Sequence, residues 1–244
     1  MAGWFSYNGL NTANINGLEV TGQDTYTVAT RNINHQAVSG RSGDVLSDDN
    51  TFKQVKITYH CTVEHDTDIE TILDTILPYL MTAGDYRALS DSYHSNTFRL
   101  AVVDKGISIE ALKPNAGGAY RVCNFDVCFS CRPERFLTAG NAQATVANNG
   151  TVTNPTAFPA YPLLEIAGTG TVNVGNQQIV IASGCPASQV FIDCETMDAY
   201  SSQGANLNAY VTLPLAQIKI NPGNNTITYS GVSSVKITPR TWKI

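Results

Sequence analysis

The chain has 244 residues, with 15 Lys and Arg against 20 Asp and Glu, which gives a formal net charge of −5 at pH 7. A protein that grips duplex DNA through its phosphates carries clustered basic residues, whereas the basic residues here stand singly, so the composition argues against such binding. No apolar stretch approaches the ~20 residues that a membrane-spanning helix needs, and the first residues lack a charged start followed by an apolar run. We therefore expect a soluble protein without membrane contact, synthesised in the cytoplasm.

The composition favours β structure. Hydrophobic residues make up 43% of the chain, enough for real cores, but charged residues make up only 14%, below the ~25% of an ordinary globular protein. Thr, Asn, Gly and Ser fill the deficit, and these residues suit strands and turns. Since domains usually hold about 100–150 residues, we expect a mainly β protein of two domains.

The first half of the chain predicts a half-buried strand followed by a helix. Apolar and polar side chains alternate strictly from Lys53 to Val63, as in an antiparallel strand with one wet face. Thr67 and Glu70 then form a capping box, and apolar residues recur at helical spacing behind it. We expect a helix from about Thr67 to Ala83, with a kink or a break at Pro78.

Further strands are expected on both sides of a domain boundary. The first domain, residues 1–137, should be a β-sandwich with this helix and a β-hairpin. Its expected strands after the helix are Phe98–Val103, Ile107–Leu112 and Tyr120–Phe129. The expected tip of the hairpin is Lys113–Gly118. Residues 138–156 hold scarcely any large apolar residue, so we expect a linker there. In residues 157–244, turn residues recur about every ten positions, as in a second β-sandwich. Its expected strands are Leu163–Ala167, Gly170–Val174, Gln178–Ala182, Gln189–Cys194, Leu207–Leu213, Asn225–Tyr229 and Ser234–Thr238.

The cysteines and histidines predict neither a metal nor a cofactor. Cys123, Cys128 and Cys131 have the spacing of plant-type iron–sulfur proteins, but they lie in a strand-forming run where successive side chains point to opposite faces. We expect all six cysteines to be reduced and packed as small hydrophobes; the other three are Cys61, Cys185 and Cys194. No two histidines have ligand spacing, which favours solvated or locally hydrogen-bonded roles for His35, His60, His65 and His94.

Enzyme signatures are incomplete, and we expect no enzyme. The segment Gly40–Asp44 resembles a nucleophile elbow only until its fifth position, which should be Gly. The segment Gly168–Asn173 fails the dinucleotide fingerprint at its last Gly. Asp193 and Glu195 could form a pair of catalytic carboxylates, but acidic pairs on a wet sheet face are equally common.

Arg87, Asp91 and Arg99 flank a turn and form a candidate structural cluster. An Arg fork there could bind loop carbonyls and a carboxylate. Independent surface charges that contribute little to stability fit the spacing as well.

Short motifs follow one another along nearly the whole chain. They are Gly40–Asp44, Tyr86–Tyr93, Phe98–Ala101, Phe129–Phe136, Asn154–Pro155, Tyr161–Ile166, Gly168–Gly170, Ile192–Glu195, Pro222–Asn225 and Thr238–Trp242. Read in order, these motifs resemble one family, the distal tail proteins of tailed bacteriophages, chiefly siphophages of Gram-positive hosts. Their order and spacing cover nearly the whole chain. The motif positions taken as structural residues are Gly40, Arg41, Ser42, Gly43, Asp44, Arg87, Asp91, Arg99, Asp193, Glu195, Pro222, Gly223 and Asn224.

The resemblance implies a structural protein of the virion, located at the phage tail tip and synthesised in the host cytoplasm. The first domain would form a homo-hexameric ring, and the second would be a galectin-like β-sandwich. Implied partners are the tail tube protein above, a tail-associated or baseplate hub protein below, and also the tape-measure and receptor-binding proteins, while DNA would pass only as cargo.

Two other functions stay open. Galectin-like sandwiches elsewhere bind glycans, so a carbohydrate-binding adsorption module is the alternative, although Tyr200, Tyr210, Tyr229 and Trp242 are scattered along the second half. A cell-wall hydrolase would need a paired acid site that nothing in the sequence singles out.

Overall fold

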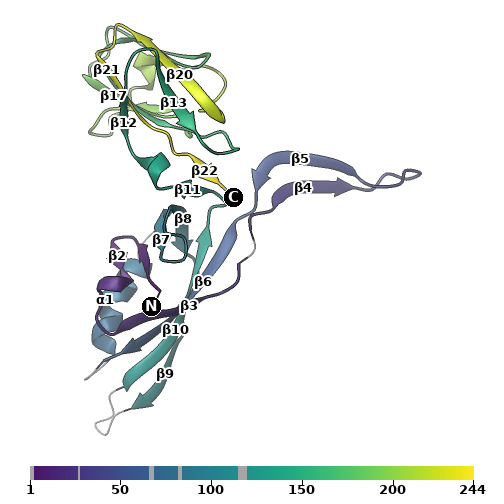
Figure 1. The fold of residues 1–244 in the computed structure, drawn as a ribbon, viewed down its shortest axis with the longest axis vertical. Coiled ribbons are helices and arrows are strands. Elements are labelled where there is room, and N and C mark those ends of the chain that lie inside the picture. Colours follow the sequence, from purple (N-terminus) through teal and green to yellow (C-terminus); the bar gives the residue numbers. More distant parts are fainter. Residues whose placement is uncertain (1–2, 27, 66–68, 82–83, 115–119) are drawn as a thin grey trace. The chain divides into compact units, whose positions relative to one another are not determined.

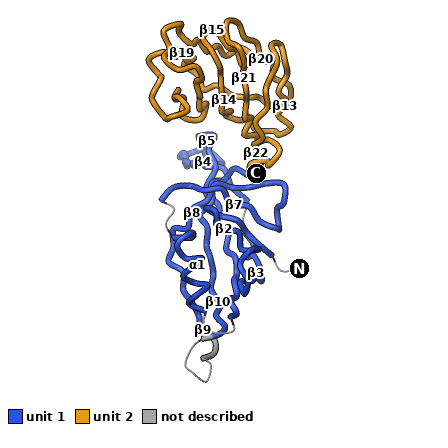
Figure 2. Tube along the Cα trace, turned by 90° about the vertical axis from the view of Figure 1, so that its left-hand side faces the viewer, with its two compact units in different colours: residues 1–135, 244 blue, residues 136–243 orange. Residues whose placement is uncertain are grey.

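The computed structural model describes residues 3–26, 28–65, 69–81, 84–114 and 120–244. The chain forms two compact units, one of residues 1–135 with residue 244, the other of residues 136–243, shown in blue and orange in Figure 2. Both are built from antiparallel strands, which confirms the mainly β, two-domain fold class.

One antiparallel sheet dominates the first unit. Its strands are β1 (Phe5–Tyr7), β2 (Leu10–Asn11), β3 (Leu18–Gln23), β6 (Val55–Glu64), β7 (Arg87–Asp91), β8 (Thr97–Val103), β9 (Ile109–Pro114) and β10 (Tyr120–Cys131). They run in the order β2-β1-β7-β8-β10-β6-β3, with β9 beside β10 (Figure 1). A 3-10 turn, η1 (Thr12–Asn14), lies between β2 and β3.

The alternation in the sequence places one face of β6 in the core, as predicted. Val55, Ile57, Tyr59, Cys61 and Val63 are at most 3% exposed, whereas the side chains between them face outward. Strand β10 pairs with β6 along the whole of β6, from Val55 to Glu64. These two long strands form the base on which the rest of the unit packs.

The sheet curls until its two halves face each other. Phe5 on β1 lies with its ring centroid 4.9 Å from that of Tyr59 on β6, and Tyr7 lies 4.9 Å from Phe129 on β10. In a flat sheet, β1 and β6 would be several strand spacings of about 4.8 Å apart. Ring contact across that separation requires the curl, which encloses an aromatic core and gives the unit its sandwich character.

The predicted helix is α1 (Glu70–Met81), and its apolar stripe belongs to the same core. Ile72, Leu73, Ile76 and Leu80 are all buried. Helical structure continues past Pro78 to Met81, so the expected break does not occur. Both ends of the predicted helix, residues 67–68 and 82–83, lie outside the described residues, and Thr67 of the capping box lies there with them. The expected hairpin tip joins β9 to β10, and its residues 115–118 also lie outside them.

Two strands of the first unit form a separate hairpin that the sequence did not predict. β4 (Arg31–Gln36) and β5 (Val45–Phe52) pair with each other in a two-stranded sheet (Figure 1). We call residues 31–52 the arm. None of its side chains is buried, which explains why it lacks the apolar alternation that reveals the other strands.

The second unit is a sandwich of two five-stranded sheets. One has the order β12-β21-β14-β17-β18 and the other β13-β20-β15-β16-β19. The strands are β12 (Ala144–Val146), β13 (Gly150–Asn154), β14 (Leu163–Ala167), β15 (Gly170–Val174), β16 (Gln177–Ile181), β17 (Gln189–Asp193), β18 (Asp198–Tyr200), β19 (Val211–Thr212), β20 (Gly223–Ser230) and β21 (Ser234–Thr238). Their inward side chains form a second core. Strand β11 (Arg135–Leu137) begins at the boundary between the units and pairs with β22 (Trp242–Lys243).

Two expectations for the second half need correction. Residues 138–156, expected as a linker, instead carry the 3-10 turn η2 (Ala139–Asn141) and strands β12 and β13, which pair with β21 and β20. Their short runs of small residues suit edge strands. The expected strand Leu207–Leu213 contains only the 3-10 turn η3 (Asn208–Tyr210) and β19.

Gly170 shows why the Gly168–Gly170 motif stands where the chain crosses from one sheet to the other. Its φ is +145°, and a Cβ there would lie 2.2 Å from the Ser230 carbonyl oxygen. Only glycine fits such a close backbone approach.

Candidate functional site

The motif Gly40–Asp44 lies at the tip of the arm, in the loop between β4 and β5. Gly40 and Gly43 have φ values of +79° and +82°, which glycine adopts without steric cost. The Arg41 backbone N–H donates to the Val38 carbonyl at 3.2 Å. All five motif residues are exposed, so the motif shapes a turn and presents Arg41 to the surroundings.

The half of the arm nearest the tip exposes apolar side chains. Ile33, Val38, Val45 and Leu46 are 38%, 44%, 38% and 60% exposed. Polar pairs hold the other half: the Arg31 guanidinium contacts Asp48 at 2.9 Å, and the Asn32 amide donates to the Thr51 hydroxyl at 2.7 Å. A lone two-stranded hairpin is marginally stable in water, and its uncovered apolar residues and strand edges favour association with another chain.

Two legs connect the arm to the large sheet, and we call residues 24–30 and 53–54 its root. In the first leg, the Asp24 N–H donates to the Thr58 carbonyl at 3.0 Å. In the second, the Gln54 side chain donates to the Tyr86 hydroxyl at 2.6 Å and accepts from Ser130 at 3.2 Å. Residues of both legs line a groove of about 370 Å³.

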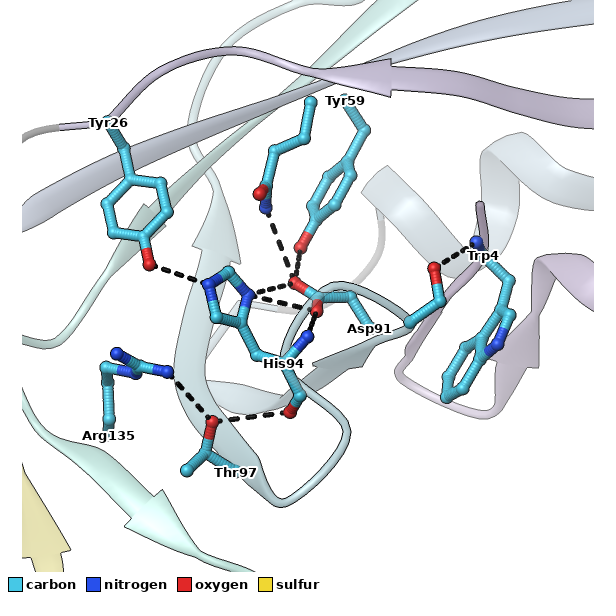
Figure 3. A network of polar contacts seen from close by, with 9 residues as sticks. Trp4, Tyr26, Tyr59, Asp91, His94, Thr97 and Arg135 are labelled. Atoms are coloured by element: carbon cyan, nitrogen blue, oxygen red, sulfur yellow. Dashed lines mark hydrogen bonds and ion pairs between the residues drawn. The ribbon is translucent and has the colours of Figure 1, made fainter. Parts of the chain in front are cut away.

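A buried polar network lies beneath the first leg (Figure 3). The Asp91 carboxylate is 6% exposed and accepts hydrogen bonds from the Tyr59 hydroxyl, the His94 backbone N–H at 2.7 Å and the Gln23 amide at 3.4 Å. The His94 ring lies 3.1 Å from Asp91 through Nδ1 and 2.7 Å from the Tyr26 hydroxyl through Nε2. The network therefore runs from the core to the root of the arm.

Burial and the nearby carboxylate both raise the pKa of Tyr59 far above its usual range, with burial the larger cause. Tyr59 therefore stays protonated and donates to Asp91. The role of this network is structural, because its polar groups satisfy one another.

The three candidate residues around this turn are not joined as an ion-pair network. Arg87 is exposed, whereas Arg99 is 6% exposed and donates to the carbonyls of Arg132 and Pro133 at 3.4 and 3.0 Å. Burial lowers the pKa of Arg99. Arg99 thus binds carbonyls of the segment after β10, whereas the hypothesis placed its partners in the turn at Tyr86–Tyr93 and added a carboxylate. The Arg99 guanidinium carbon also lies 5.7 Å from the centroid of the Tyr26 ring.

In the second unit, the motif residues hold turns. Asp193 forms a bidentate ion pair with Arg240, at 2.9 and 3.1 Å, and accepts from the Glu195 N–H at 3.0 Å. Glu195 lies in the turn after β17 and not on the strand, so the two carboxylates do not form a pair along one strand face. The Pro222–Asn224 motif opens β20: Gly223 has a φ of +86°, and the Asn224 side chain accepts from Thr153 at 2.8 Å.

The aromatic residues considered for glycan stacking are mostly engaged within the unit. Trp242 stacks on Phe158 at 4.4 Å, and its indole N–H donates to the Pro159 carbonyl. Tyr200 stacks on Phe191 at 5.7 Å. Ring faces used in this way are less available to a sugar.

The described residues contain no group of three or more His, Cys, Asp or Glu side chains that could hold a metal ion. Within the same ranges, no helix is long and apolar enough to cross a membrane. All six cysteines are free thiols, and four of them are buried, namely Cys61, Cys123, Cys131 and Cys194. Burial raises the pKa of Cys61, Cys131 and Cys194 to about 12, so these thiols stay protonated and pack as small hydrophobes.

The architecture is that of a two-unit β protein with a projecting hairpin, and one of three comparisons with known proteins finds a similar fold. No protein-family model matches the chain, and no curated protein matches it. Among solved structures, the chain is similar to the crystal structure of the SPP1 Dit protein (gp 19.1), described as a paradigm of the hub adsorption apparatus in phages that infect Gram-positive bacteria. The sequence identity is 11% and the TM-score 0.68, and the match covers 100% of both chains. The chain therefore has the fold of a phage distal tail protein.

Proposed function

We propose that the chain is a structural hub protein of a phage tail tip and not an enzyme. Six copies would form a ring that joins the tail tube protein above to a tail-associated or baseplate protein below. Tape-measure and receptor-binding proteins are further expected neighbours. The full-length similarity to the SPP1 Dit fold supports the hub role, and the hexamer and the partners rest on the family resemblance.

The observation that carries the assembly proposal is the arm. It exposes Leu46 and three other apolar side chains that its own chain leaves uncovered. Copies that each insert such an element into a different surface of the next copy make heterologous contacts, and contacts of this kind close into rings when the rotation between copies permits. The arm is therefore the proposed contact between neighbouring copies.

Assembly can be tested with two matched leucine variants. Leu46 is 60% exposed on the arm, and Leu215 is fully exposed in a loop of the second unit. We expect Leu46→Asp to shift the purified protein from ring to monomer in light scattering at micromolar concentration, and Leu215→Asp to assemble like the wild type.

Two outcomes would contradict the proposal. If Leu46→Asp assembles as well as the wild type, the arm is not the contact. A wild-type protein that is monomeric in solution and also present as separate single copies in purified tails would contradict the ring itself.

A further inference from the structure

His60 lies between two carboxylates that come from different elements. It projects from the outer face of β6. Its Nδ1 is 2.7 Å from Asp126 Oδ1 on β10, and its Nε2 is 2.8 Å from Asp24 Oδ1 in the arm root. On the side of β6 away from β10, Gly22 of β3 lies beside the ring, and a Cβ there would make ordinary van der Waals contact with His60 Cδ2 at 3.6 Å.

This geometry requires the charged form of the imidazole. An ionised carboxylate only accepts hydrogen bonds, and a neutral imidazole has one N–H donor and one acceptor nitrogen. A neutral ring would therefore turn a lone pair toward one of the two carboxylates. In the imidazolium form, both nitrogens donate. The pKa of His60 is accordingly raised, first by the hydrogen bond to Asp126 and then by the one to Asp24.

The contact lies where the arm begins. Asp24 is the last residue of the first leg with a backbone hydrogen bond to β6. Its side chain is held by His60, and two residues further on Tyr26 is held by His94. The second leg is fixed instead through Gln54, whose amide does not titrate. The two legs of the arm therefore differ in their response to pH.

We propose that protonated His60 clamps the first leg of the arm to the large sheet, and that its deprotonation releases the leg. The folded-state pKa of His60 is raised, so the contribution of the clamp is fully present below the ordinary imidazole pKa of about 6.5 and is lost as the pH rises through the raised value. The clamp rests on the proposed function in one respect: the role of the arm in assembly is taken from there.

The other charged groups near His60 stand further from its ring. Glu19 on β3 opposes Thr62, two residues along β6 from His60, and Lys56 lies on the same face of β6. Lys105 and Glu110 line the adjacent groove of about 540 Å³ together with Asp24 and Asp126. Asp24 and Asp126 are the charged groups that contact the ring, so each of them should set its titration.

The first test is an NMR titration of the imidazole resonances in the full chain labelled at histidine. We expect the His60 midpoint to lie above about 6.5. Asp126→Asn and Asp24→Asn should each lower it by about 0.5 pH unit or more, because each removes one charged acceptor. His35 on the exposed arm is the internal reference, and its midpoint should not move. A His60 midpoint at or below about 6.5, or one that neither variant changes, would overturn the proposal.

The second test follows the leg by hydrogen exchange and mass spectrometry of peptides covering residues 20–30. After correction for the intrinsic pH dependence, we expect exchange to rise about threefold or more as the pH passes the His60 midpoint. In His60→Gln, which can hold only one carboxylate with its amide N–H, this rise should vanish. Persistence of the same rise in His60→Gln would overturn the clamp.

Light scattering of the same samples separates this proposal from the ring. Both titrations concern a single chain. A His60 midpoint and an exchange profile as expected, in a protein that never assembles, would contradict the proposed function and leave the clamp intact.

Discussion

Asp91 is the residue on which the polar interior of the first unit depends. Its buried carboxylate accepts from a tyrosine hydroxyl, a backbone N–H and a glutamine amide. Removing it leaves the donors of Tyr59 and His94 without an acceptor, and an unsatisfied buried donor costs about 1–3 kcal/mol.

We expect Asp91→Ala to lower the free energy of unfolding by about 2–4 kcal/mol in urea melts. Asp104→Ala removes an exposed carboxylate of the same unit and should stay within about 0.5 kcal/mol of the wild type. Equal stabilities of the two variants would mean that the network does not stabilise the unit.

Leu73 tests the packing of α1. It is 2% exposed and lies in the core cluster with the β6 side chains. Truncation leaves a cavity, so Leu73→Ala should cost about 2–5 kcal/mol. The neighbouring Asp74 is exposed, and Asp74→Ala should change stability by less than about 0.5 kcal/mol. A loss below about 0.5 kcal/mol for Leu73→Ala would show that the helix stripe is not core.

At the scale of elements, the arm contributes nothing to either core. The Lys53 N–H donates to the Thr30 carbonyl at 2.9 Å, so the two legs come close enough for an Asn-Gly turn to replace residues 31–52. We expect the shortened protein to keep its thermal unfolding midpoint within a few degrees, since no buried side chain is lost. Circular dichroism melts measure this, and a large drop would show that the arm stabilises its own unit.

Elements with one buried face could be predicted from the sequence, and the arm could not. Strand β6 and helix α1 carry periodic apolar residues because each buries one side against the core. The arm buries no face, so its sequence from Arg31 to Phe52 shows no apolar period. It is mostly polar, with a glycine-containing turn in the middle. The short edge strands β12 and β13 escaped prediction for a related reason: only one to two side chains of each are buried.

The candidate residues were located more easily than their partners. Asp91 and Arg99 were singled out from the sequence as one candidate cluster, but Asp91 binds Tyr59 and His94 whereas Arg99 binds the carbonyls of Arg132 and Pro133. The sequence could not show that Tyr59 and His94 would reach Asp91, because those contacts depend on how the sheet curls. Likewise, His60 was expected to be locally hydrogen-bonded, and its two carboxylates come from distant parts of the chain. Alternation had already placed it on the outer face of β6.

At the scale of the whole molecule, charge bears on the proposed passage of DNA. In the proposed ring, six copies at −5 each would carry a formal charge of −30. Strong duplex binding needs several Lys or Arg contacts to phosphate, and a channel wall that lacked them would let DNA slide. We expect no gel shift of duplex DNA at physiological salt and micromolar protein. Micromolar affinity, or a ring of Arg facing the axis in the assembled tail, would contradict this expectation.

The curled sheet also determines when the first unit can fold during synthesis. Strand β1 is synthesised first, but it pairs with β7, and its aromatic rings pack on β6 and β10. Most of residues 1–135 must therefore leave the ribosome before these contacts can form. Folds dominated by such distant pairings fold slowly, in milliseconds to seconds. The arm emerges early in that interval with its apolar tip uncovered. If the arm makes the contact between copies proposed above, nascent chains on one messenger would meet through their arms before their cores close, and the timing of translation would influence which copies assemble together.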